Sequence, residues 1–340
     1  MMINLKDIEK IDTKKMFKIY DRWPEIAKIS WNSEIKLMNC FEINHIVFAG
    51  MGGSGSLGDI FSSILSETKI HVTVNKGYNL PKTVDEKTIV IVTSISGNTD
   101  ETLTVLKKAE EKNCKLIAFT SNGKMKEYCI KNKIDFREIS MEHSPRASLI
   151  KFFYCMIKVL KPILPIIDKD IEKSIVDLEK TRVNISSSNL TTSNQSLQLA
   201  IWIKQIPLIY FPSGLNAASI RFKNSLQENS KSHAIAEDII EACHNGIMAW
   251  EKISNVQPII IRGNNDHFKT HERWEILKQY FSDKGIEYKE IISEQENIIS
   301  KIINLIYLLD YTSIYVSIIS KIDPTSVDSI NYVKSRCTKQ

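Results

Sequence analysis

The feature that most constrains the fold of this chain is a repeated order of short Val- and Ile-rich runs, loops with Gly or Ser, and amphipathic stretches. Residues 45–49 form the first run, and the loop Gly50-Met51-Gly52-Gly53-Ser54-Gly55 follows before apolar residues recur at helical spacing. Similar runs lie at residues 70–74, 88–92 and 115–119. Continuous apolar runs that alternate with helices are typical of a parallel sheet covered on both faces. The first half is therefore predicted to be an α/β domain.

The same order restarts in the second half, after the Ser-, Thr- and Asn-rich stretch 180–196 that we interpret as a linker. The runs 207–211 and 258–261 each end in a loop with Gly, and a helix is expected from about Asn216. This internal similarity favours two related domains, and 340 residues with 43% hydrophobic residues suffice for two cores. We predict an N-terminal helical segment at 1–35, a first domain at 36–180, and a second domain with C-terminal helices at 195–340.

The charge and the cysteines argue against several classes of protein. The net charge is only +5, and no basic stripe interleaved with aromatic residues is present, so nucleic-acid binding is not expected. The six cysteines form no CxxC pair, so we expect reduced thiols in a cytoplasmic protein without a disulfide frame or zinc knuckle. His267 and His271 are spaced four residues apart, but no third ligand is evident and no metal site is predicted.

One apolar segment, between Lys301 and Lys321, has nearly the length of a membrane span. Asn304 and Asp310 interrupt it, and a charged side chain at the centre of a bilayer is costly. The segment is therefore predicted to be a buried helix with no membrane partner. The tyrosines within it, at positions 307, 311 and 315, recur every four residues and are expected to pack in a core or interface.

The loop 50–55 matches the dinucleotide fingerprint G-x-G-x-x-G and follows a predicted strand. That fold needs an acidic residue about 20 positions further on, to bind the ribose hydroxyls. Residues 72–77 contain no acid, which argues against NAD, but Lys76 leaves an NADP-linked dehydrogenase open. A Walker A loop is excluded because no Gly-Lys-Ser/Thr follows. Glycines that only allow a tight turn are the structural alternative.

A second loop offers three hydroxyls where a strand meets a helix, on Ser94, Ser96 and Thr99. Free backbone N–H groups and the positive end of a helix dipole lie at such a point, so the loop is suited to one phosphate monoester. Simple N-capping by Ser96 or Thr99 is the alternative, although one cap needs one hydroxyl. Both loops follow parallel strands, where open α/β sheets bind ligands.

Five motifs give the chain a family resemblance from about residue 40 to 336. Gly50-Met51-Gly52-Gly53-Ser54, Ser94-Ile95-Ser96-Gly97-Asn98-Thr99, Ser144-Pro145-Arg146-Ala147, Glu228-Asn229-Ser230-Lys231 and His244-Asn245 resemble, in this order, the motifs of bifunctional phosphoglucose/phosphomannose isomerases. These enzymes belong to the phosphoglucose isomerase superfamily. The resemblance implies an α/β fold with two SIS-type, flavodoxin-like three-layer αβα domains, parallel sheets and a C-terminal helical segment.

The resemblance also implies roles for individual residues. Gly52, Gly53, Ser54, Ser94, Ser96 and Thr99 would bind the substrate, with the four hydroxyls on its phosphate. Glu228 would move a proton between C2 and C1 of the open-chain sugar, with Arg146 and the Gly53 backbone beside the enediol intermediate. His244 would assist ring opening from the neighbouring subunit of a homodimer, and Lys334 would face the sugar ring. The chemistry needs one base and one positive charge but no cofactor and no metal.

The resemblance thus predicts interconversion of glucose 6-phosphate, and of mannose 6-phosphate, with fructose 6-phosphate. Two departures are visible: Ser230 replaces a usual alanine, and Val327 occupies a position where some relatives have threonine, with Thr325 two residues away. The second departure bears on mannose 6-phosphate. A non-catalytic SIS protein that binds a phosphosugar and regulates another process remains the alternative. It would share Ser54 and the 94–99 loop but would need neither Glu228 nor His244.

Overall fold

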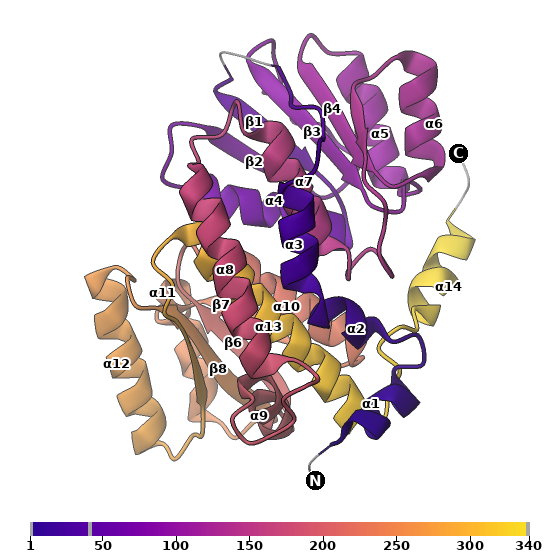
Figure 1. The fold of residues 1–340 in the computed structure, drawn as a ribbon. Coiled ribbons are helices and arrows are strands. Elements are labelled where there is room, and N and C mark those ends of the chain that lie inside the picture. The colour runs from indigo at the N-terminus through magenta and orange to yellow at the C-terminus, as the bar shows by residue number, and fades with distance from the viewer. Residues whose placement is uncertain (1–2, 40–42, 338–340) are drawn as a thin grey trace.

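The computed structural model describes residues 3–39 and 43–337, which form two parallel sheets enclosed by helices (Figure 1). The first sheet has the strand order β2-β1-β3-β4-β5 and the second has the order β7-β6-β8-β9. In both sheets every strand pair is parallel. The predicted fold class, two flavodoxin-like α/β units, is confirmed.

The first sheet contains the four strands that the sequence predicts and one that it does not. The strands are β1 (His45–Ala49), β2 (His71–Asn75), β3 (Thr88–Ser94), β4 (Lys115–Thr120) and β5 (Phe136–Glu138). Strands β1 and β3 are buried throughout, which explains their continuous apolar sequence. The missed strand β5 has only three residues, two of them charged, and lies at the edge of the sheet.

The second sheet repeats this order with one strand fewer. Its strands are β6 (Ile206–Phe211), β7 (Ile235–Asp238), β8 (Val256–Gly263) and β9 (Lys289–Ser293). The predicted runs 207–211 and 258–261 correspond to β6 and β8, which are the two central strands. The edge strands β7 and β9 are partly exposed and carry charged residues, so they lack the apolar signal of a buried strand.

The helices that surround the sheets are given in three groups, in chain order. The N-terminal segment contains α1 (Leu5–Ile11), α2 (Met16–Asp21) and α3 (Trp23–Trp31). The first half adds α4 (Gly52–Leu65), α5 (Asp100–Glu110), α6 (Gly123–Asn132) and α7 (Leu149–Leu160). The remainder comprises α8 (Asp168–Ile185), α9 (Gln195–Trp202), α10 (Asn216–Asn229), α11 (Ile239–Ala242), the 3₁₀ helix η1 (Gly246–Glu251), α12 (Phe268–Asp283), α13 (Ile298–Ile319) and α14 (Asp328–Arg336).

The stretch predicted as a linker begins inside a helix. Helix α8 continues to Ile185, so residues 180–185 are helical and a loop occupies residues 186–194. Ile185 is buried at 1% exposure, and its packing extends the helix beyond what its polar neighbours suggest. The domain limits themselves stay a prediction.

The inner faces of both sheets share one core. Ile46 and Phe48 of β1 lie in the same buried cluster as Ile259 and Ile261 of β8, together with residues of α13. The alternate residues of each sheet face separate outer clusters, under α5 and α6 in the first half and under α11 and α12 in the second. Each sheet is therefore covered on both faces, and the two inner helical layers meet between the sheets (Figure 1).

Helix α13 runs through the middle of this shared core, as the buried-helix prediction expects. It is long and apolar enough to cross a membrane by composition, but 89% of its most apolar window is buried inside the protein. The hydroxyls of Tyr307, Tyr311 and Tyr315 bind the backbone of Tyr20, the carboxylate of Asp21 and the backbone of Ile185. The tyrosine row thus packs in the core and joins α13 to α2 and α8.

Candidate active site

Two loops meet at the carboxyl edge of the first sheet, as predicted. The loop after β1 leads into α4, and the loop after β3 leads into α5. The hydroxyl of Ser54, in the first turn of α4, accepts a hydrogen bond from the backbone N–H of Ile95 at 3.1 Å. Ser54 and Ser94 are 8% and 1% exposed, so this junction is buried at its base.

The hydroxyls of these loops form hydrogen bonds with the loops themselves. Ser94 donates to the hydroxyl of Thr99 at 3.1 Å, and Ser96 accepts from the backbone N–H of Asn98 at 3.4 Å. Ser54, Ser96 and Thr99 thus use their oxygens as acceptors, and their own hydrogens stay available. Thr99 occupies the N-cap of α5 but its hydroxyl binds Ser94 and not the first helical N–H groups. The capping alternative does not account for it.

Glycine and asparagine inside the loop have structural roles. Gly97 has φ +70°, and a Cβ there would lie 1.6 Å from the carbonyl oxygen of Asn122. The Asn98 side chain accepts from the backbone N–H of Lys124 at 3.1 Å and donates to the carbonyl of Ser96 at 3.1 Å. The loop is therefore held against the start of α6, which fixes the hydroxyls before any ligand binds.

Arg146 lies directly beside the glycine loop. A Cβ on Gly53 would contact the carbonyl of Pro145 at 3.4 Å and the Cα of Arg146 at 3.5 Å, so the two backbones approach closely. The segment that carries Arg146 follows β5 and therefore also lies at the carboxyl edge of the first sheet. The backbones of Gly53 and Arg146 thus lie side by side, and their place beside the intermediate stays a prediction.

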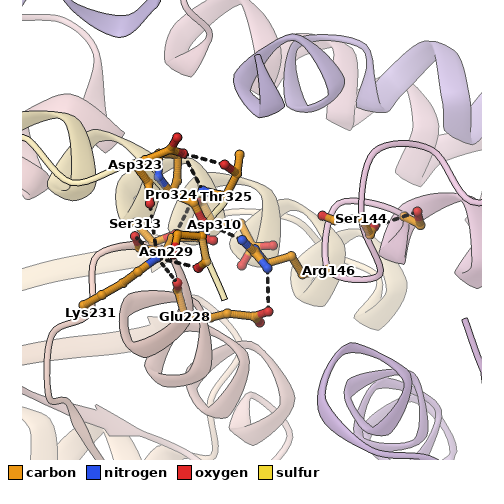
Figure 2. Close-up of polar contacts among 12 residues, drawn as sticks. Ser144, Arg146, Glu228, Asn229, Lys231, Asp310, Ser313, Asp323, Pro324 and Thr325 are labelled. Atoms are coloured by element: carbon orange, nitrogen blue, oxygen red, sulfur yellow. Dashed lines mark hydrogen bonds and ion pairs between the residues drawn. The ribbon is translucent and has the colours of Figure 1, made fainter. Parts of the chain in front are cut away.

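The guanidinium of Arg146, 3% exposed, joins three parts of the chain (Figure 2). Its Nη1 donates to the carboxylate of Glu228 at 2.6 Å, and its Nη2 donates to the carbonyl of Pro324 at 2.5 Å. Its Nε is buried and has no acceptor among the described residues. A buried donor without a partner is uncommon in folded proteins, and among the described residues no acceptor satisfies this N–H of the guanidinium.

Glu228 reaches this position from the second half of the chain. It lies in the last turn of α10, and its side chain is 30% exposed. The contacts from Glu228 to Arg146, from Arg146 to Gly53, and from Ser54 to Ile95 connect the carboxylate to the hydroxyl loop. Glu228, Arg146, Gly53 and the loop 94–99 thus border one region between the two halves.

A buried ion pair supports this region and was not predicted. Arg221 of α10 donates to Asp310 of α13 at 2.8 Å, and both residues are almost fully buried. Ser225 and Tyr20 also donate to the Asp310 carboxylate, at 2.5 and 3.3 Å. The second Arg221 contact, from Nη2 to the carbonyl of Arg146 at 2.9 Å, holds the backbone of the site arginine. The sequence signal was the aspartate inside an apolar helix.

Two predicted site residues lie outside the group formed by Arg146 and Glu228. His244 is exposed and follows β7 and α11, at the carboxyl edge of the second sheet, whereas Glu228 lies in the last turn of α10, which leads away from that edge over about 20 Å. Lys334 is exposed on α14, a helix without buried residues. This helix begins just after the 323–326 segment that binds Arg146. In the described part of the chain, neither His244 nor Lys334 forms a hydrogen bond or ion pair with Glu228.

The far end of α14 lies near the first half. The pKa of Tyr78 is raised, mostly by the carboxylate of Glu101 and to a smaller extent by the thiol of Cys337. Glu101 belongs to the first turn of α5. Helix α14 begins just after the segment that binds Arg146, and in Figure 1 it runs beside the first half, with its C-terminal end towards α6.

The corresponding edge of the second sheet has different chemistry. A cavity of about 690 Å³ lies there, lined by the loops after β6 and β8 and by the starts of α12 and α13. Four carboxylates line it, those of Glu67, Asp170, Asp266 and Glu296, with Lys301 as the lysine among the lining residues. This excess of negative charge disfavours a phosphate. The hydroxyl loop of the first sheet is the better phosphate site.

The remaining alternatives from the sequence gain no support. Lys76, the residue that left NADP open, forms an ion pair with Asp59 at 2.5 Å and is thus occupied by a carboxylate. His267 caps the N-terminus of α12, where its Nδ1 accepts from the N–H of Lys269 at 3.2 Å. Both residues therefore have local structural roles.

Family models match both halves of the chain. The SIS domain model matches residues 41–149, and the model for the bacterial phospho-glucose isomerase C-terminal SIS domain matches residues 192–337. Among solved structures, the C-terminal domain of glucosamine-fructose-6-phosphate aminotransferase from Francisella tularensis superposes with a TM-score of 0.68 at 16% identity, over 92% of this chain and 98% of that one. Glucosamine-6-phosphate deaminase from Thermotoga maritima gives 0.63 at 14% identity, over 94% and 95%. These structures share the fold.

Sequence relatives are more informative. A bifunctional phosphoglucose/phosphomannose isomerase from Caldicellulosiruptor bescii is 32% identical over 87% of this chain and 90% of its own length. The Aquifex aeolicus relative of the same name is 29% identical over 86% and 90%. A D-glucosamine-6-phosphate 4-epimerase from Sulfolobus acidocaldarius is 28% identical over 72% and 77%. With two SIS domains and this near full-length similarity, the chain belongs to the family of bifunctional phosphoglucose/phosphomannose isomerases.

Proposed function

We propose that this protein interconverts glucose 6-phosphate with fructose 6-phosphate, and mannose 6-phosphate with the same ketose, by proton transfer through an enediol. The observation that carries the proposal is the ion pair between Glu228 and Arg146, next to a loop of preoriented hydroxyls. The family to which this chain belongs favours an isomerase over a non-catalytic phosphosugar-binding protein. A carboxylate and a guanidinium at one spot are the two groups that this reaction requires.

The phosphate of the substrate would bind at the carboxyl edge of the first sheet. Ser54, Ser96 and Thr99 can each donate a hydrogen, and Ser94 holds Thr99 in place. The start of α4 adds backbone N–H groups, because its N-cap residue, Met51, offers no oxygen for capping. Hydrogen bonds to a charged group contribute about 1.5–3 kcal/mol each, so this cradle can fix the sugar chain at one end.

The proton transfer would then take place at the other end of the sugar. The Glu228 carboxylate takes the proton from C2, the C–H electrons form the C1–C2 double bond, and the carbonyl oxygen on C1 becomes an oxyanion. The proton of the hydroxyl on C2 moves to that oxygen, and Glu228 returns its own proton to C1 as the ketone forms on C2. The unpartnered Nε of Arg146 is available to stabilise the developing oxyanion.

His244 would open the sugar ring from a second subunit. In one chain His244 is exposed and follows β7 and α11, whereas Glu228 lies in the last turn of α10, so His244 would act at this site across an interface. The segment after it exposes Met248 at 62% and Ile253 at 100%, and apolar side chains exposed near one another mark interaction surfaces. We therefore propose a homodimer, with His244 as the group that titrates near neutrality.

Three further expectations belong to this proposal. Lys334 would approach the sugar ring when α14 lies over the site, since this helix starts beside the Arg146–Glu228 pair. The free cysteines of the described part of the chain, Cys114, Cys129, Cys155, Cys243 and Cys337, support a reducing, cytoplasmic compartment. Thr325 donates to Asp323 at 2.6 Å, so its hydroxyl is committed to the chain, and use of mannose 6-phosphate must depend on other contacts.

The test is turnover of purified protein with glucose 6-phosphate, mannose 6-phosphate and glucosamine 6-phosphate in separate assays, each with a chelator present. We expect fructose 6-phosphate from the first two substrates. The Glu228→Gln variant should still bind fructose 6-phosphate but lose roughly 10²–10⁴-fold in kcat. Glu127→Gln, on the exposed face of α6, is the matched control and should behave as the wild type. Full turnover by Glu228→Gln would show that another group is the base.

A further inference from the structure

Lys231 follows Glu228 by three residues, and the proposed chemistry gives it no task. It comes directly after Ser230, the C-cap residue of α10, and has a left-handed backbone with φ +56°. Residues other than glycine seldom adopt this conformation. The conformation turns the side chain back over the end of α10, towards the segment that connects α13 to α14 (Figure 2).

The ammonium of Lys231 binds backbone carbonyls on two elements. On α10 it donates to the carbonyl oxygen of Glu228 at 2.8 Å and contacts that of Asn229 at 3.3 Å. On the segment 323–326 it donates to the carbonyl oxygen of Ser326 at 2.9 Å and contacts that of Asp323 at 3.2 Å. A lysine at a helix C-terminus commonly satisfies the last carbonyls, but this one also holds a second element against them.

Arg146 also joins Glu228 to this segment. It binds the carboxylate of Glu228 and the carbonyl of Pro324, whereas Lys231 binds the carbonyl of Glu228 and the carbonyls of Asp323 and Ser326. Two cations thus join the same residue, Glu228, to the same four-residue segment. Burial is the larger cause that lowers the pKa of Lys231, and the positive charge of Arg146 lowers it further, as expected for two cations that lie close together.

The segment 323–326 also sets the start of α14. Asp323 binds the backbone N–H and the hydroxyl of Thr325 at 2.8 and 2.6 Å, and it accepts from the hydroxyl of Thr13 at 2.8 Å. Helix α14 begins two residues after Ser326 and buries none of its own residues. Its orientation therefore depends on how this segment is held.

We infer that Lys231 is a positioning residue for the isomerisation: it holds the 323–326 segment to the end of α10, and so sets both the direction of the Glu228 carboxylate and the placement of α14. The inference rests on the proposed function. Without the lysine, the end of α10 and the segment separate, Arg146 follows Pro324, and the base loses its alignment with C2. Misplacement of a catalytic group by about 1 Å can cost on the order of 100-fold in rate.

The chain offers a closely matched control. Lys321 also follows a helix C-cap residue, Ser320, and also has a left-handed backbone with φ +57°. Its side chain makes no hydrogen bond or ion pair with the described residues, and it is exposed. Lys231→Met and Lys321→Met therefore remove the same group from the same backbone conformation, and only the first removes the contacts between α10 and the segment 323–326.

The first measurement is amide hydrogen exchange on the full-length protein, which needs no enzymatic activity. We expect faster exchange over residues 323–336 in Lys231→Met and wild-type exchange there in Lys321→Met. Equal exchange in the two variants would overturn the inference. If the wild-type protein turned over none of the sugar phosphates, the proposed function would fail, and this measurement would still decide whether Lys231 holds the segment.

The second measurement is steady-state kinetics with glucose 6-phosphate and its C2-deuterated form. In Lys231→Met we expect kcat to fall by about tenfold or more, with KM changed by less than about threefold because the phosphate loop is untouched. The deuterium isotope effect on kcat should rise as proton abstraction becomes slower. Lys231→Arg, which keeps the charge and the donors, should recover most of kcat.

A structural role alone would lower thermal stability without raising the isotope effect. Unchanged kcat in Lys231→Met, despite faster exchange in α14, would overturn the coupling to Glu228. If Lys231→Met does not fold, Lys231→Gln, which keeps N–H donors without the charge, is measured in its place, with the same expected directions.

Discussion

Glu228 and Arg146 form an ion pair of 2.6 Å although 82 residues separate them in the chain and they belong to different halves of the protein. The arginine comes from the segment after β5, at the edge of the first sheet, and the glutamate comes from the last turn of α10. Neither half alone contains the pair. The chemistry proposed for this protein therefore depends on how the two halves pack against each other.

Replacement of Arg146 by lysine is expected to impair catalysis although the lysine keeps the positive charge. A lysine donates from one nitrogen, which cannot occupy the separate positions of Nη1 at Glu228, Nη2 at Pro324 and Nε. We expect kcat to fall by roughly 10²–10³-fold, the range found when a donor to a developing oxyanion is lost. The measurement is initial rate with glucose 6-phosphate. Arg182→Lys, at an exposed ion pair on α8, should leave the rate unchanged.

Replacement of Thr99 by valine should weaken substrate binding more than catalysis. The valine keeps the size of the side chain but removes both the acceptor for Ser94 and the donor for a phosphate. Loss of one charge-assisted hydrogen bond, about 1.5–3 kcal/mol, corresponds to a rise in KM of roughly tenfold or more. Thr104→Val is the control, because its hydroxyl only returns to the carbonyl of Asp100 on the same helix. A KM unchanged in Thr99→Val would remove this residue from the phosphate site.

Gly97 should tolerate no side chain. Its φ of +70° costs an alanine about 1–2 kcal/mol, and the new Cβ would lie 1.6 Å from the carbonyl of Asn122, which adds further strain. Gly97→Ala is therefore expected to lower the denaturant midpoint and to raise KM, because the hydroxyl loop has to shift. Gly77→Ala, where a Cβ would meet nothing within 4 Å, should leave both quantities unchanged.

Removal of the charge on Asp310 should cost far more than a typical surface substitution. Asp310→Asn leaves the guanidinium of Arg221 buried without its counter-charge. Breaking a buried ion pair in this way costs about 3–5 kcal/mol, measured as the free energy of unfolding in urea. The double variant Arg221→Met/Asp310→Leu should recover part of that loss. If it is as unstable as the single variant, the charge imbalance is not the cause.

Stability should decrease as the pH falls below about 6.5, the ordinary pKa of histidine. Burial lowers the pKa of His45, and the charge of His71 lowers it further; burial also lowers the pKa of His143. In this range the unfolded chain binds protons that the folded protein does not, so the free energy of unfolding decreases with decreasing pH. The free energy of unfolding is measured by urea unfolding at several pH values between about 7 and 5. His45→Gln should reduce the slope.

The central strands were predictable from the sequence, whereas three of the four edge strands were not. Strands β1 and β3 are buried on both faces and so consist of continuous apolar residues, which a sequence shows directly. Strands β5, β7 and β9 lie at sheet edges, are three to five residues long and contain charged residues. Their pairing depends on neighbours far along the chain, and no local pattern contains that information.

The site shows the same division. Ser94, Thr99, Arg146 and Glu228 were predicted from short motifs, and the structure brings their segments together. Arg221 and Asp310 lie 89 residues apart and match no motif, so their contact with the Arg146 backbone could be found only in three dimensions. The placement of His244 and Lys334 at the sugar stays a prediction, because it involves a second subunit for the first and the position of α14 for the second.

The core that extends from β1 to β8 has a consequence for how this protein can change over time. Two domains that each had a separate core could be exchanged, cut apart or expressed one at a time. Here Ile46 and Phe48 of one sheet share their buried cluster with Ile259 and Ile261 of the other, through α13. Isolated residues 195–340 would present that cluster to water and should aggregate. The two halves repeat one strand order, but they share a core and are expected to fold only together.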